Sequence, residues 1–79
     1  MEQARNFVYE QIRQKRLNIG SFLEYKWLWQ ASALESPIIK NNYLKILEEM
    51  LEEGLLEERE GHPNGAFLTK KGFDVVYNQ

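Results

Sequence analysis

The sequence predicts a small, mostly helical α+β fold in which three helices precede a two-stranded hairpin and a short closing helix. Three observations predict it. Apolar residues recur at helical spacing in segments before residue 54, a dense turn signal occupies residues 61–65, and short apolar runs flank that turn. The 79 residues are the length of one small domain, and we expect residues 1–79 to form it.

The first two helices are expected at residues 4–16 and 22–33. One side of the first is apolar and consists of Ala4, Phe7, Val8 and Ile12. Its other side holds Arg5, Tyr9, Arg13 and Arg16. Ser21 and Glu24 have the spacing of a capping box, in which each side chain satisfies a backbone amide at a helix start. The second helix is therefore expected to begin at Phe22, and it is apolar nearly all round.

The third helix is expected from Pro37 to Glu53, because Ser36 and Pro37 are typical of a helix start and Gly54 of a helix end. Its predicted buried stripe consists of Tyr43, Leu44, Leu47, Met50 and Leu51. The predicted opposite side consists of Asn41, Asn42, Lys45, Glu48, Glu49, Glu52 and Glu53.

The hairpin is expected from a strand at 55–60, a turn at 61–65 and a strand at 66–69. Thr69 is expected to cap a final helix at 70–77. The strand at 55–60 has poor intrinsic propensity, because it is rich in glutamate, and its position before the turn is what indicates it.

Composition excludes several classes of protein. The chain has no cysteine and a single histidine, His62, so we expect no disulfide, no metal site and no cofactor. No nucleophile–base pair or glycine-rich phosphate loop is present, so we expect no enzyme. The sequence lacks a secretory signal and an apolar run of the roughly 18 residues that a membrane span needs, so a cytoplasmic protein is expected.

Charge is unevenly distributed along the chain. The net charge is −2. Residues 48–60 hold seven acidic residues against Arg59 alone, a local charge of −6, whereas nine basic and five acidic residues elsewhere give +4. A basic surface is therefore compatible with the acidic total.

Two segments resemble parts of a known fold family. Residues 47–59 (LEEMLEEGLLEER) resemble the end of a recognition helix that runs into the wing of winged-helix regulators. Residues 68–72 (LTKKG) are similar to the leucine-threonine-x-x-glycine with which many such domains leave the wing. The resemblance covers about the last 40 residues, and the first 35 match only in helix order.

The resemblance implies a transcription regulator that reads duplex DNA, with the helix at 37–53 in the major groove and the wing at 61–65 on the backbone or in the minor groove. By position, it implies that bases are read by Lys40, Asn41, Asn42 and Lys45, and that His62 and Asn64 lie at the wing tip. Phosphate contacts are expected from Arg13, Lys15, Arg16, Lys70 and Lys71. A homodimer would suit DNA with two half-sites.

Other features oppose DNA binding or give these residues ordinary roles. The third-helix glutamates repel phosphate, and Lys45 has the spacing to pair with Glu48 or Glu49. Asparagines at a helix start also serve as caps, and His62 is equally suited to a turn. The basic residues at 13, 15, 16, 70 and 71 have the alternative of flanking their helices as solvated side chains.

The aromatic second helix predicts a different function. Tyr25, Trp27 and Trp29 provide more apolar surface than one side of a three-helix core requires. They are either buried between the first and third helices or exposed as a patch for a protein partner. The alternative to DNA binding is therefore a protein-interaction module that works through this helix.

Overall fold

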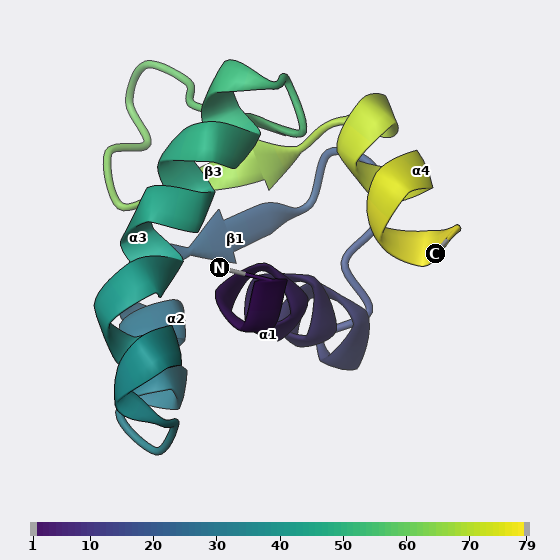
Figure 1. The fold of residues 1–79 in the computed structure, drawn as a ribbon. Helices are drawn as coiled ribbons and strands as arrows, with labels where there is room; N and C mark the ends of the chain where they lie inside the picture. The colour runs from purple at the N-terminus through teal and green to yellow at the C-terminus, as the bar shows by residue number, and fades with distance from the viewer. Residues whose placement is uncertain (1, 79) are drawn as a thin grey trace.

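The computed structural model describes residues 2–78, which adopt a mostly helical α+β fold with a small antiparallel sheet (Figure 1). The elements are α1 (Glu2–Gln14), β1 (Phe22–Glu24), α2 (Tyr25–Ser32), α3 (Pro37–Glu52), β2 (Leu56–Glu57), β3 (Gly65–Leu68) and α4 (Lys70–Tyr77). The expected helices and hairpin are present, whereas β1 was not predicted.

The prediction that a helix begins at Phe22 is wrong. Residues 22–24 form an antiparallel strand with β3, in which Leu23 lies opposite Ala66. The expected capping box is absent, because Glu24 precedes α2 without a side-chain cap and the Ser21 hydroxyl accepts a hydrogen bond from the amide of Asn18. Pairing with β3 satisfies the backbone and buries Leu23, so tertiary contacts outweigh the local signal.

The close approach of β1 and β3 depends on Gly65. A Cβ at this position would clash with the carbonyl oxygen of Leu23 and with the ring of Phe22. Only glycine therefore allows the two strands to pair at this point.

Helix α1 buries the predicted apolar side, and Tyr9 as well. Tyr9 was expected on the polar side, but it is buried, and its hydroxyl accepts a hydrogen bond of 2.9 Å from the Arg5 guanidinium. Because α1 packs against both α3 and α4, a wider part of its surface is buried than the single apolar stripe that was predicted. The helix ends at Gln14, and Arg16 takes a left-handed conformation (φ 54°) just beyond it.

Helix α3 confirms the predicted boundaries to within one residue, but its buried side is rotated from the predicted stripe. Ile46 is fully buried, although it was not assigned to the stripe. Leu44, which was assigned to it, is 58% exposed. Gly54 follows the helix in the left-handed conformation expected of it (φ 79°).

The hairpin and the last helix form as expected, with shorter strands than predicted. Leu56 pairs with Leu68 and Glu57 with Phe67, so the loop between the strands runs from 58 to 64. The hydroxyl of Thr69 accepts a hydrogen bond from the amide of Gly72, which confirms Thr69 as the cap of α4.

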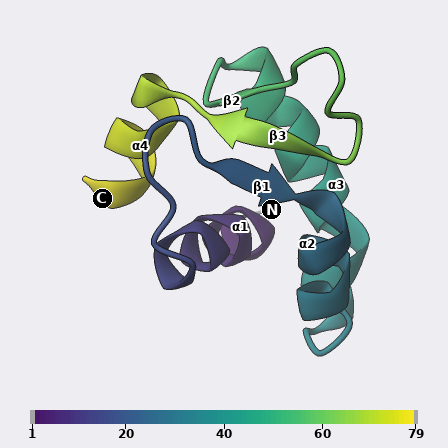
Figure 2. The same ribbon diagram turned by 180° about the vertical axis from the view of Figure 1, so that it is seen from behind.

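The core lies between the helices and one face of the sheet. Figure 2 shows the strands side by side in the order β1-β3-β2, with α1 beneath β1. Leu23, Ala66 and Leu68 bury their side chains on the inner face of this sheet. From the helices, the core receives Phe7, Val8, Ile12, Leu28, Ile46, Met50 and Val76.

Candidate functional site

The side chains expected to read bases lie along the first half of α3. Lys40, Asn41 and Lys45 are exposed, and within residues 2–78 their side chains form no hydrogen bond or ion pair. Asn42 is half-buried, and its amide group donates a hydrogen bond of 2.6 Å to the carbonyl of Ile38. Asn42 therefore serves its own helix, which is one of the roles that the sequence left open.

The four glutamates of α3 and its end divide between two sides. Glu49 and Glu53 were expected beside Lys45, but they turn toward α1, where the Arg5 guanidinium lies 2.7 Å and 3.3 Å from their carboxylates. Hydrogen bonds to Tyr9, Glu49 and Glu53 raise the pKa of Arg5 against the opposing effect of burial. Glu48 and Glu52 are exposed.

The basic residues at the end of α1 are largely engaged within the fold. Arg13 donates a hydrogen bond of 2.9 Å to the carbonyl of Val76 in α4. The Lys15 ammonium lies 4.4 Å from the centre of the Trp27 ring, a distance typical of a cation–π contact. Arg16 is exposed. Two of these three expected phosphate contacts therefore have structural partners.

The basic residues at the start of α4 are engaged in the same way. The Lys71 ammonium donates a hydrogen bond of 2.8 Å to the carbonyl of Glu53, at the end of α3. Lys70 forms an exposed ion pair of 3.2 Å with Asp74, one turn further along α4. Lys71 thereby joins α4 to α3, and Lys70 supports its own helix.

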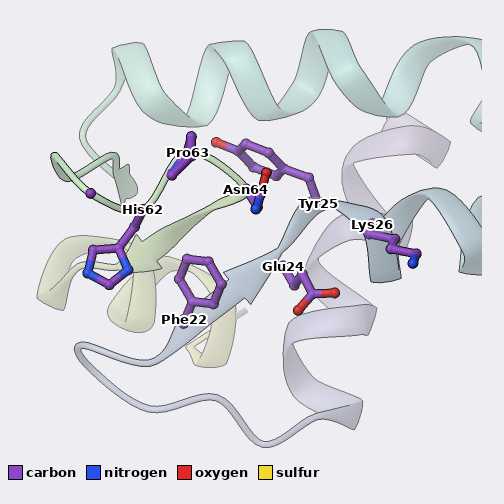
Figure 3. Close-up of a pocket in the computed structure, with 8 residues that line it drawn as sticks. Phe22, Glu24, Tyr25, Lys26, His62, Pro63 and Asn64 are labelled. Atoms are coloured by element: carbon purple, nitrogen blue, oxygen red, sulfur yellow. The ribbon is translucent and has the colours of Figure 1, made fainter.

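The β2–β3 loop, residues 58–64, lies against the start of α2 (Figure 3). His62 and Asn64 are exposed. The His62 ring lies 6.0 Å from the Phe22 ring and 5.1 Å from the Phe67 ring, so it extends an aromatic cluster on the outer face of the sheet. The carbonyl of Asn64 accepts a hydrogen bond of 2.9 Å from the amide of Tyr25.

The three aromatic residues of α2 have different surroundings. Trp27 is half-buried against the core beneath Lys15. Tyr25 is half-buried, and its hydroxyl donates a hydrogen bond of 3.0 Å to Glu58; burial and this bond raise the pKa of Tyr25 to about 12. Trp29 is 63% exposed. Burial between α1 and α3, one of the two expectations for this helix, is therefore wrong for Trp29.

Apolar side chains of α2 and α3 line two adjoining depressions; Trp29 and Leu44 are exposed, Tyr25 and Leu51 are half-buried, and Leu47 is buried (4% exposed). We define the α2–α3 strip as Tyr25, Trp29, Leu44, Leu47 and Leu51. Trp29 and Leu44 line one open depression, and the other three residues line a second together with Leu44. Leu44 borders both depressions, so it is the centre of the strip.

Opposite charges lie at the two ends of the α2–α3 strip. Lys40 lines the depression beside Trp29, whereas Glu48 and Glu58 line the depression beside Tyr25. Lys40, Leu44 and Glu48 follow one another at four-residue intervals, which places them along one side of α3. The strip is therefore apolar at its centre, positive at one end and negative at the other.

Sequence reasoning missed Leu44 as a surface residue, although a signal was present. Tyr43, Ile46, Leu47 and Met50 follow the spacing i, i+3, i+4 and i+7, which is sufficient to define one buried side. Leu44 lies at the edge of that side and extends it toward α2. A predicted buried side limited to these four residues would have left Leu44 as an apolar residue outside the core.

Other types of site find no support in the part of the chain that the structure describes. Across residues 2–78, no group of three histidine, cysteine or acidic side chains is positioned to hold a metal ion. No helix in this range is long and apolar enough to cross a membrane. Comparisons with models of protein families, with curated proteins and with solved structures find no match to this chain.

Proposed function

We propose that this chain is a winged-helix domain that binds another protein through the α2–α3 strip. The order α1-β1-α2-α3-β2-β3-α4, with three antiparallel strands in the order β1-β3-β2, supports the winged-helix part of the proposal. The β2–β3 hairpin corresponds to the wing, and α3 corresponds to the helix that enters DNA in regulators of this fold.

The exposure of Trp29 and Leu44 over the same depression carries the proposal. Their exposed fractions are 63% and 58%, and both belong to the α2–α3 strip. Contiguous apolar surface rimmed by polar residues is typical of protein interfaces, and tryptophan and tyrosine are enriched among the residues that dominate binding energy. A strip that joins Trp29 to Tyr25 combines both properties.

The charge distribution favours a protein over duplex DNA. The depression between α3 and the β2–β3 loop is lined by Glu48, Glu58 and apolar residues of the strip, and no lysine or arginine lines it. Phosphate contacts supply most of the affinity for DNA and depend on lysine and arginine. Three of the five basic residues expected to provide them contact other parts of the fold, and Lys70 pairs within its own helix.

DNA binding is the second candidate, and one observation favours it. Lys40, Asn41 and Lys45 are exposed and unpaired within residues 2–78, while Arg5 draws Glu49 and Glu53 away from them. Asparagine and lysine are suited to adenine and guanine in the major groove. Docking of this kind would use only the first two turns of α3.

Retention of proteins from an extract of the source cell tests the proposal. The immobilised chain is expected to retain a protein that Trp29→Ala releases and that Gln30→Ala, an exposed neighbour outside the strip, does not release. The retained protein is then purified, and its affinity for the wild type and both variants is measured directly. The proposal fails if no retained protein depends on Trp29.

Fluorescence anisotropy with a random-sequence duplex pool tests the DNA alternative. We expect no binding at about 200 mM salt and little at about 50 mM, because Glu48 and Glu58 repel phosphate. Binding that weakens steeply with salt and is lost in Lys45→Glu would support DNA as the partner and contradict our proposal.

A further inference from the structure

The two ends of the α2–α3 strip are oppositely charged, so two copies of the strip are complementary when they lie antiparallel. Lys40 and Glu48 lie four residues before and four residues after Leu44 on α3. Each is about 6 Å along the helix from Leu44, at 1.5 Å per residue. Neither Lys40 nor Glu48 forms an ion pair within residues 2–78.

We propose that the strip binds a second copy of this chain, with the two α3 helices antiparallel and Leu44 at the twofold axis. This inference rests on the proposed function and names the protein partner. In a twofold interface the same patch of both copies is in contact. If one residue contacts a second residue of the other copy, the reciprocal contact forms as well. An antiparallel arrangement places Lys40 of each copy opposite Glu48 of the other, which gives two ion pairs per dimer.

The charge pattern also determines the orientation. If the helices were parallel, Lys40 would face Lys40 and Glu48 would face Glu48, and like charges across an interface are costly. The antiparallel arrangement converts both contacts into attraction while keeping Leu44 against Leu44. Trp29 flanks this contact from α2 in each copy and provides the largest apolar side chain.

The dimer is expected to be weak and reversible. Stable interfaces bury about 800 Å² on each partner, whereas the strip is a single row of five side chains on a molecule with 5100 Å² of surface. We therefore expect dissociation constants in the range of about 1 µM to about 1 mM. The dimer also occupies the exposed side of α3, so it competes with DNA for the same helix.

Sedimentation equilibrium over this concentration range tests the proposal. The apparent mass of the wild type is expected to rise from 9.4 kDa toward twice that value. Lys40→Glu and Glu48→Lys are each expected to weaken association about tenfold or more, because each creates two like-charge contacts per dimer. The double variant Lys40→Glu/Glu48→Lys restores both attractive pairs and is expected to recover association.

Mixing the two single variants gives a sharper result. A Lys40→Glu copy has glutamate at both positions and a Glu48→Lys copy has lysine at both, so their mixture forms a heterodimer with two ion pairs. We expect this mixture to associate although each variant alone does not. Circular dichroism of each variant checks that the exposed substitutions leave the helices intact.

The outcomes separate this inference from the proposed function. A wild-type chain that remains monomeric while another protein is retained through Trp29 overturns the dimer and leaves the proposed function standing. A dimer that is indifferent to both charge reversals and to Leu44→Ala uses another face and also overturns the inference. If neither self-association nor Trp29-dependent retention occurs, both proposals are wrong.

Discussion

The α1–α4 side of the molecule and the α2–α3 strip use similar residues in opposite ways. On the α1–α4 side, Arg5, Arg13 and Lys71 each contact a group on another helix or at its end. On the strip, Lys40 and Glu48 have no such partner within residues 2–78, and Trp29 and Leu44 are more than half exposed.

The difference shows that charge in the sequence is a poor guide to a binding surface until its partners are known. The basic residues expected to contact phosphate mostly connect the first and last helices to the rest of the fold. The exposed, unpaired residues lie instead around an apolar row that the sequence assigned largely to the core. A binding surface is therefore better identified from exposed side chains that have no hydrogen-bond or ion-pair partner within the fold.

The largest expected effect contrasts two residues of α3. Ile46 is fully buried and Leu44 is 58% exposed. Ile46→Ala is expected to lower the free energy of unfolding by about 2–5 kcal/mol, because it removes packed side-chain atoms and leaves a cavity. Leu44→Ala is expected to change it by less than about 0.5 kcal/mol.

Urea denaturation of the monomer, at low protein concentration, measures both free energies. Equal losses for Ile46→Ala and Leu44→Ala would show that Leu44 belongs to the core. The strip would then lose its central residue.

A smaller effect contrasts the caps of α4 and α3. The Thr69 hydroxyl accepts a hydrogen bond from the amide of Gly72 and donates to the carbonyl of Gly54, whereas Ser36 makes no side-chain cap. Thr69→Ala is expected to lower the free energy of unfolding by about 1 kcal/mol, and Ser36→Ala by only about 0.3 kcal/mol. Thermal unfolding of the two variants compares them, and a larger loss for Ser36→Ala would contradict the assignment of the caps.

The smallest effect concerns Tyr25 at the end of the strip. Its pKa in the folded chain is about 12, above the ordinary value of 10, so the neutral hydroxyl is the form that folding favours. The resulting stability is fully present below pH 10 and is lost as the pH rises through about 12. Spectrophotometric titration is expected to show a tyrosine that ionises near pH 12 and is absent from Tyr25→Phe. If the tyrosine missing from Tyr25→Phe ionises near pH 10 instead, the raised pKa of Tyr25 is contradicted.

Local patterns were enough to predict α1, α3, α4 and the hairpin. Helical spacing identified the helices, and Gly54 and Thr69 identified their boundaries because each acts through its own backbone or a neighbouring amide. Strand β1 could not be predicted in this way. It forms because residues 22–24 meet residues 65–67, more than 40 positions away, and nearby residues gave the stronger signal of a capped helix.

The candidate site was predicted only in part, for a similar reason. The exposure of Asn41 and Lys45 agrees with expectation, since periodicity places them opposite the buried stripe, whereas for Trp29 exposure was one of two alternatives. The rotation of α3 that exposes Leu44 and turns Glu49 toward Arg5 depends on where α1 packs. That packing joins residues 44 positions apart, a distance at which one sequence provides no signal.

Tyr25 links the β2–β3 loop to the strip. Its backbone amide donates to the carbonyl of Asn64, its hydroxyl donates to Glu58, and its ring lines the strip beside Leu47. Both ends of the loop are thus anchored to one residue that a partner on the strip would touch. Occupancy of the strip is therefore expected to change how fast the Tyr25 amide exchanges its hydrogen with solvent, because that amide and the Tyr25 hydroxyl hold the two ends of the loop.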